Sequence, residues 1–99
     1  MIWELAQIDI KPGQEAAFEA AVAQAVAIFK RNRGYRALQL HRGIEQPGRY
    51  RLLVEWETVE DHTVDFRNSS DFQEWRKLVG HHFAATPVVD HMECVLSAK

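Results

Sequence analysis

The residues of this chain best suited to acid–base or metal chemistry are its five histidines and its single cysteine, Cys94. His62 is the strongest candidate for a general base, because it shares a predicted short helix with Val59 and Phe66. Its unperturbed pKa of about 6.5 suits proton transfer at neutral pH. The alternative is a partly exposed histidine near a helix start, which is the commoner situation for this residue type.

The other histidines and the cysteine lack the spacing of a metal site. His81 and His82 are neighbours, and neighbouring side chains on a helix point about 100° apart, unlike the i, i+4 pairs that bind zinc. His91 and Cys94 are three residues apart, so they would face opposite sides of a strand. We therefore expect no metal and no cofactor, and we expect Cys94 to be a buried, inert thiol.

Aromatic side chains gather in the same part of the chain as His62. They could line a pocket for a flat substrate through offset stacking. Their spacing also fits the inner stripes of helices packed on a sheet, so an ordinary core is the alternative, and both hold if the core contains a cavity. The candidate substrate-binding residues are Trp56, Phe66, Phe72 and Trp75.

Arginines flank the second and third predicted strands and could bind an acidic substrate. Exposed charges are easily placed, so a solvated edge or salt links across a dimer are the favoured interpretation. The chain has no Gly-rich phosphate loop, no Gly-x-Ser-x-Gly and no paired-carboxylate pattern. The arginines concerned are Arg36, Arg42, Arg49 and Arg51.

Composition places the chain among soluble globular proteins, with 46% hydrophobic and 26% charged residues. A net charge of −2 with interspersed signs lacks the basic stripe of a nucleic-acid-binding protein. No apolar run approaches the ~20 residues of a membrane span, and the N-terminus has no signal-peptide pattern. With a single cysteine, these features predict a cytoplasmic protein without nucleic-acid or membrane partners.

Hydrophobic periodicity predicts four strands separated by helical segments. The order β-α-β-β-α-β predicts an α+β, ferredoxin-like fold, in which the helices cover one face of a four-stranded antiparallel sheet. We expect a single domain over residues 1–99. The predicted strands are 2–10, 35–42, 49–57 and 88–96.

The helical segments have recognisable ends. An Ala-rich amphipathic helix covers residues 14–32, and Gly34 is its predicted stop. Two short helices follow the third strand, and Thr58 and Ser70 are their predicted N-caps. Gln73 gives the second of them a capping-box form.

The two faces of the predicted sheet differ in character. One face should carry Ile8, Leu52, Val54 and Trp56 against the helices, with Glu4 interrupting the inward series of the first strand. The other face mixes aromatic, aliphatic and polar side chains, so a partner sheet should cover it, and we expect a homodimer. That face should hold Trp3, Leu5, Gln7, Leu53 and Glu55, with Val89, His91 and Val95 or, for a register shifted by one, the alternate set.

Over residues 2–95 the chain resembles the antibiotic biosynthesis monooxygenase domain, a branch of the dimeric α+β barrel superfamily. The likeness rests on the acid–Trp pair that ends the third strand and on the Ser-x-x-Phe of the second short helix. It rests also on the run into the last strand. The residues are Glu55-Trp56, Ser69 to Phe72, and Pro87, Val89, Asp90 and His91.

The resemblance implies oxidation of a small aromatic, phenolic or quinol-like compound with O2, without flavin or metal. The substrate would lose a proton, and the protein would supply a dry aromatic pocket between helices and sheet, a base, and hydrogen bonds to the developing oxyanion. In this interpretation His62 is the base, and a small aromatic ligand and a second copy of the chain are the partners.

One position departs from the family pattern. Many relatives have a His-x-x-Ser-x-x-Phe motif, and here Phe66 stands at the position of the His. This substitution favours an alternative, a non-catalytic ligand-binding or stress-related protein of the same fold. Haem-degrading relatives are a more distant comparison, because their ligating His would fall near Trp75 or Arg76.

Overall fold

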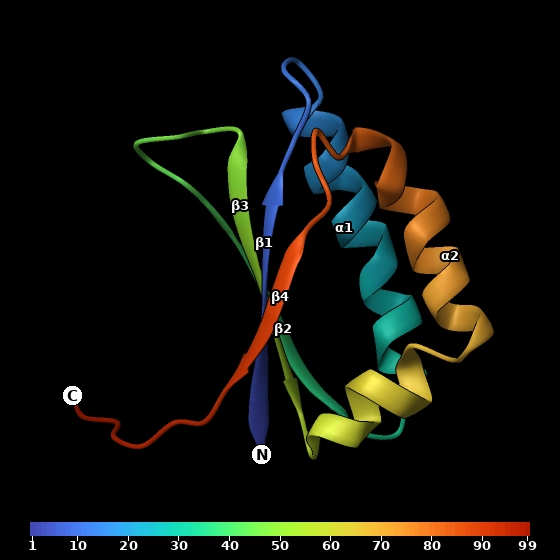
Figure 1. Ribbon diagram of the computed structural model, residues 1–99, viewed down its shortest axis with the longest axis vertical. Coiled ribbons are helices and arrows are strands. Elements are labelled where there is room, and N and C mark those ends of the chain that lie inside the picture. Colours follow the sequence, from blue (N-terminus) through green and yellow to red (C-terminus); the bar gives the residue numbers. More distant parts are fainter.

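The computed structural model describes all 99 residues, and a split βαβ arrangement is visible in Figure 1. None of its helices combines the length and hydrophobicity needed to cross a bilayer. The elements are β1 (Ile2–Asp9), α1 (Glu15–Lys30), β2 (Tyr35–Arg42), β3 (Arg49–Trp56), the π-helix η1 (Asp61–Phe66), α2 (Ser70–Val79), the 3₁₀ turn η2 (Gly80–His82) and β4 (Val88–Met92).

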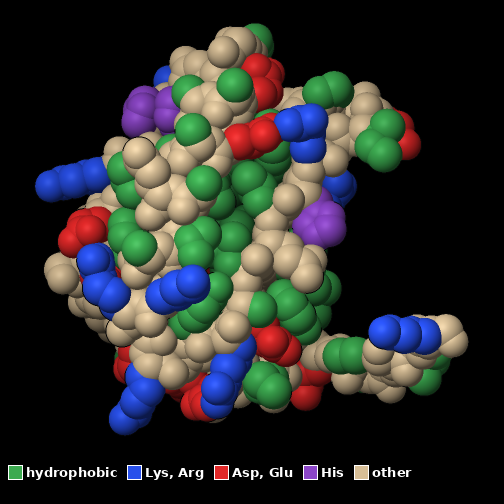
Figure 2. All heavy atoms as spheres, turned by 180° about the vertical axis from the view of Figure 1, so that it is seen from behind, with side chains coloured by type: hydrophobic (Ala, Val, Ile, Leu, Met, Phe, Trp, Pro, Cys, Tyr) green, Lys and Arg blue, Asp and Glu red, His purple; other side chains and the backbone are tan.

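The four strands form one antiparallel sheet in the order β2-β3-β1-β4. Both long helices lie on the same face of this sheet, and the opposite face carries no helix (Figure 1). The predicted ferredoxin-like α+β fold is thereby confirmed. Figure 2 shows hydrophobic side chains gathered between the helices and the sheet.

Sixteen buried hydrophobic residues form the core between the two layers. The inner stripe predicted for the first helix is buried in full, from Phe18 to Phe29. Phe29 stacks on Phe66 with ring centroids 4.9 Å apart and meets Trp75 edge-on at 5.0 Å. Arg31 ties the ends of α1 and α2 together through Asp71, at 2.7 Å. The helices are therefore fixed to each other as well as to the sheet.

The last strand is shorter than predicted, and its residues face the two sides of the sheet in the alternate register. Pairing with β1 places Glu4 opposite His91 and Ala6 opposite Val89. Because opposed residues share a face, His91 and Val89 point towards the helices, and their placement on the open face was wrong. The open face instead receives the alternate set, Val88, Asp90 and Met92.

The chain after Met92 leaves the sheet instead of continuing the strand to residue 96. This tail runs out on the side opposite to the helices, as does the loop between β2 and β3 (Figures 1 and 2). Val95 and Leu96 in the tail are 94% and 84% exposed. Cys94 is exposed as well, so the expected buried thiol was wrong.

The caps of the two short helical segments differ from each other. Thr58 caps the first as predicted, and its hydroxyl and backbone N–H both donate to Asp61 Oδ2 while the Asp61 N–H donates to Thr58 Oγ1. The second helix is capped by Ser69, one residue earlier than predicted. Ser69 has the extended backbone of an N-cap, and its hydroxyl accepts from the Phe72 N–H at 3.3 Å.

Gly34 does not end the first helix by adopting positive φ; Gly13 alone in the chain does so. Helix α1 ends at Lys30, and the Asn32 side chain donates to the Ile28 carbonyl at 3.0 Å. The backbone at Gly34 lies so close to the Asp61 side chain that only glycine fits there. A Cβ atom at this position would lie 2.5 Å from Asp61 Cβ and 2.2 Å from Asp61 Cγ.

The substitution Gly34→Ala is therefore expected to break the Thr58–Asp61 cap and to lower the free energy of unfolding by about 1–3 kcal/mol. Urea denaturation measures this effect. Gly80→Ala is the matched control, because a Cβ at Gly80 meets nothing within 4 Å. Equal stability of the two variants would refute the assigned role of Gly34.

Candidate active site

A cavity of about 730 Å³ lies between the α2 side of the helical layer and the sheet. Phe66, Phe72 and Trp75 line it from the helices, as the sequence predicted, and small or aliphatic residues of the sheet line its other wall. Trp56 is fully buried beside the cavity and is absent from its lining. Core packing and a cavity therefore coexist in the same aromatic cluster.

Glu4 is a buried carboxylic acid in the wall of this cavity. It occupies an inward position of β1, is 6% exposed, and accepts a hydrogen bond from the Trp56 indole N–H at 3.1 Å. His62 Nε2 lies 3.3 Å from the same oxygen, Oε1. Alternation along β1 forces the side chain into the core, where a carboxyl group needs polar partners.

Burial raises the pKa of Glu4 from 4.5 to about 7. Desolvation disfavours the carboxylate, and this effect exceeds the opposing effects of the Trp56 hydrogen bond and the positive charge of Arg67. A carboxylate with a pKa near neutrality is a much stronger base than an exposed one. It can accept a proton at physiological pH and release it again.

His62 is buried in η1 with its ring stacked on Trp56, at 5.6 Å between centroids and 16° between planes. Its pKa is lowered from 6.5 to about 4, first by burial and then by the charges of Arg67 and His91. The imidazole is therefore neutral at pH 7. Its contact with Glu4 Oε1 at 3.3 Å therefore joins a neutral ring to the carboxyl group and is not an ion pair at neutral pH.

Glu4, His62 and His91 form an acid–base chain, in which His62 Nδ1 is hydrogen-bonded to His91 Nε2 at 2.9 Å and His62 Nε2 lies 3.3 Å from Glu4 Oε1. When Glu4 is ionised, a proton on His62 Nε2 would face the carboxylate, and His91 Nε2–H would donate to His62 Nδ1. When Glu4 carries the proton, His62 can hold its own proton on Nδ1 and donate it to His91 Nε2. His91 is half-buried on the edge strand β4. The series Glu4–His62–His91 therefore leads from the cavity wall to the protein surface.

The π-helical winding of η1 brings His62 and Phe66 to the interior together. Their rings are 6.4 Å apart, while Val64 and Asp65 between them are exposed. Single π-helical turns are frequent at functional sites. The segment Thr58–Phe66 thus positions one member of the acid–base chain and one wall of the cavity.

Sequence reasoning found His62 but missed Glu4 and His91. The signal for Glu4 was its interruption of the inward apolar series of the first strand, since a carboxyl group at a core position is either paired or functional. The placement of His91 on one face depended on the register of the last strand, and the short sequence of that strand does not specify its register. Both positions follow at once from the pairing of β1 with β4.

The remaining candidate residues lie apart from the Glu4–His62–His91 series. His82 is buried and bonds Gln14 Oε1 at 2.8 Å, and His81 is exposed beside it. On α2, Trp75 is buried and Arg76 is exposed, and the helix carries no imidazole that could ligate haem iron. No group of three or more His, Cys, Asp or Glu side chains is arranged to hold a metal ion.

The sequence matches the family model for antibiotic biosynthesis monooxygenase over residues 1–78. It is 43% identical to the Bacillus subtilis protein YczJ over an alignment of 95 residues, and this alignment covers 96% of this chain and all of YczJ. A crystal structure of a protein assigned to the same family from Bordetella bronchiseptica has 59% identity and a TM-score of 0.95, covering 96% of this chain and 97% of that one.

A more distant structure shares the fold at low sequence identity. SnoaB, a cofactor-independent oxygenase from Streptomyces nogalater, superposes with a TM-score of 0.83 at 16% identity, over 97% of this chain and 94% of that one.

Proposed function

Because this chain belongs to the antibiotic biosynthesis monooxygenase family, we propose that it is a cofactor-independent monooxygenase. Its substrate would be a small aromatic, phenolic or quinol-like compound, oxidised with O2. The observation that carries the proposal is Glu4, a carboxyl group with a pKa of about 7 in the wall of an aromatic cavity and within 3.3 Å of His62. SnoaB adds support, since the same fold belongs to a cofactor-independent oxygenase there.

Glu4 is the proton acceptor in this proposal, and His62 is its neutral polar neighbour at 3.3 Å. A histidine with a pKa of about 4 is a weak base, so His62 alone is less suited to the role than Glu4 at neutral pH. Phe66, Phe72 and Trp75 would hold a flat ring against the sheet and keep water away from it.

The reaction begins with transfer of a substrate proton, from a hydroxyl or an activated methylene, to the Glu4 carboxylate. The resulting carbanion or phenolate is electron-rich enough to reduce O2. For a methylene, one oxygen atom becomes a carbonyl oxygen of the product and the other leaves as water, which takes up both hydrogens. Glu4 returns the first proton to the departing oxygen, so the carboxylate is regenerated for the next turnover.

Oxygen uptake tests the proposal. The protein is expected to consume O2 with at least one member of a panel of electron-rich phenols, hydroquinones and anthrones, and His62→Ala is expected to lose at least about 90% of the rate. His41→Ala is the control, because His41 is exposed on β2, outside the cavity. A folded protein that consumes no oxygen with any member of the panel would contradict the proposal.

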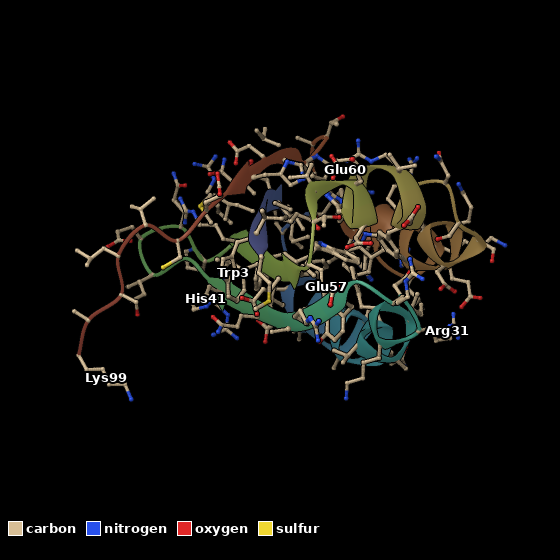
Figure 3. All side chains as sticks on the ribbon, turned by 90° about the horizontal axis from the view of Figure 1, so that it is seen from below. Trp3, Arg31, His41, Glu57, Glu60 and Lys99 are labelled. Carbon is tan, nitrogen blue, oxygen red and sulfur yellow. The ribbon has the colours of Figure 1, made fainter.

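We also propose that the protein is a homodimer formed through the open sheet face. Trp3 lies on this face, on the same side as the C-terminal tail (Figure 3). Val88 and Met92 are 62% and 39% exposed beside it, and the tail adds Val95 and Leu96. Apolar side chains in this arrangement are suited to burial by a second copy. Sedimentation equilibrium should give a mass of two chains.

A non-catalytic ligand-binding protein is the second candidate function, favoured by Phe66 at the position where relatives carry a His. A space filled solid by Trp56, Phe66 and Trp75 would have favoured it over the enzyme, whereas the cavity of about 730 Å³ beneath the helices leaves room for a ligand under either function. Binding of aromatic compounds without oxygen uptake, in a folded protein, would favour this alternative over the enzyme.

A further inference from the structure

The charged residues around the cavity are unevenly distributed. The chain as a whole has 14 acidic and 12 basic side chains. The cavity is nevertheless lined by three cations, Arg67, Arg76 and Lys77, and by one acid, the buried Glu4. All three cations are exposed to solvent, so they mark the mouth of the cavity, whereas Glu4 lies in its interior.

None of these three cations forms an ion pair. Four of the eight arginines have carboxylate partners, whereas Arg67 and Arg76 are among the four that do not. The paired ones are Arg31 with Asp71 and Glu74, Arg36 with Glu57, Arg42 with Glu19, and Arg49 with Asp9.

The cations also lie close to the aromatic wall and to the acid–base chain. The Arg76 guanidinium carbon is 6.0 Å from the centroid of the Phe72 ring, which itself lines the cavity. The charge of Arg67 lowers the pKa of both Glu4 and His62, so its field extends to the interior end of the cavity. A ring held along Phe72 would therefore have its outer end among cations.

We propose that the substrate carries a permanent carboxylate, which Arg76 and Lys77 bind at the cavity mouth while the oxidisable ring extends inward towards Glu4. An arginine fork matches a carboxylate in geometry, and such charge-assisted hydrogen bonds are the stronger kind. Arg67, whose charge reaches Glu4, favours the deprotonated form of the reacting ring. This inference rests on the proposed function for the identity of the reacting ring and on the cavity for the site of binding.

A matched pair of fluorescent probes tests the inference without requiring turnover. 6-Hydroxy-2-naphthoic acid and 2-naphthol share the same ring system, and only the first is an anion at pH 7. Fluorescence titration is expected to give at least about tenfold tighter binding of the acid at low ionic strength. The preference should shrink as salt is added, because exposed charges are screened.

The double variant Arg76→Gln/Lys77→Gln is expected to lose this preference while its affinity for 2-naphthol stays within about twofold of wild type. The control Arg33→Gln/Lys30→Gln removes the same two charge types from residues outside the cavity that form no ion pairs. It should keep the preference in full.

Equal affinity for the two probes, binding of neither, or equal loss of preference in both double variants would overturn the inference. The outcome is separable from the proposed function. Preferential binding of the acid without oxygen uptake by any phenol would leave the carboxylate site standing and remove the oxygenase. Oxygen uptake without any preference for acids would do the reverse.

Discussion

Glu4→Gln is expected to lower kcat/KM for oxygen uptake by at least about 100-fold at pH 8, the lower end of what a positioned general base contributes. The amide has the shape of the carboxyl group and still accepts a hydrogen bond from the Trp56 N–H, but it cannot take up a proton. Steady-state oxygen uptake with the best substrate of the panel measures the effect.

Glu60→Gln is the control for this substitution. Glu60 precedes η1 and lies at the outer edge of the molecule (Figure 3), where it forms no ion pair and does not line the cavity. If Glu4→Gln retained wild-type turnover, the base would have to be another group, and His62 would be the next candidate. Circular dichroism of both variants should match the wild type.

The same substitution is expected to stabilise the protein at alkaline pH. The folded-state pKa of Glu4 is raised from 4.5 to about 7, so the folded protein holds this proton more tightly than the unfolded chain. Stability from Glu4 is complete below pH 4.5 and is lost as pH rises through 7. A shift of this size corresponds to about 3 kcal/mol.

Glutamine does not titrate, so the advantage of Glu4→Gln over wild type should grow by about 3 kcal/mol between pH 4.5 and 8 and then level off. Urea denaturation across this range measures it. The unfolded-state titration of His62 is common to both proteins and cancels in the difference. A difference that stays constant with pH would contradict the raised pKa of the buried carboxyl group.

The two expectations for Glu4 describe a conflict between stability and activity. A base of pKa about 7 requires a carboxyl group removed from water, and its ionised form is costly to bury. The Trp56 N–H and the stacked His62 ring limit this cost by providing one donor and one polar neighbour to the same oxygen. Replacing Glu4 should therefore improve the fold and impair the chemistry.

The fold was predictable from the sequence because its signals are periodic and redundant. The inward stripe of α1 and the alternation of β3 each involve several residues, so one exception such as Glu4 does not obscure them. The short last strand had no such redundancy. Its five residues acquire a face only through pairing with β1, and a shift of one residue moved His91 from the open face to the face that carries the helices and the cavity.

The candidate site was partly predictable for the same reason. Phe66, Phe72 and Trp75 share the cavity wall because helical spacing placed them on inward stripes. The acid–base chain joins residues from β1, η1 and β4, which no local pattern connects. Its pKa values arise from burial in the assembled core, a property that sequence spacing does not contain.

The pH dependence of oxygen uptake tests the central claim most directly, with a substrate whose own hydroxyl stays protonated up to pH 9. For the wild type, kcat/KM is predicted to rise with an apparent pKa of about 7 as Glu4 ionises, and Glu4→Gln is predicted to lose both the rise and the activity. A wild-type profile that is flat from pH 5 to 9, or that persists unchanged in Glu4→Gln, would contradict the assignment of Glu4 as the base.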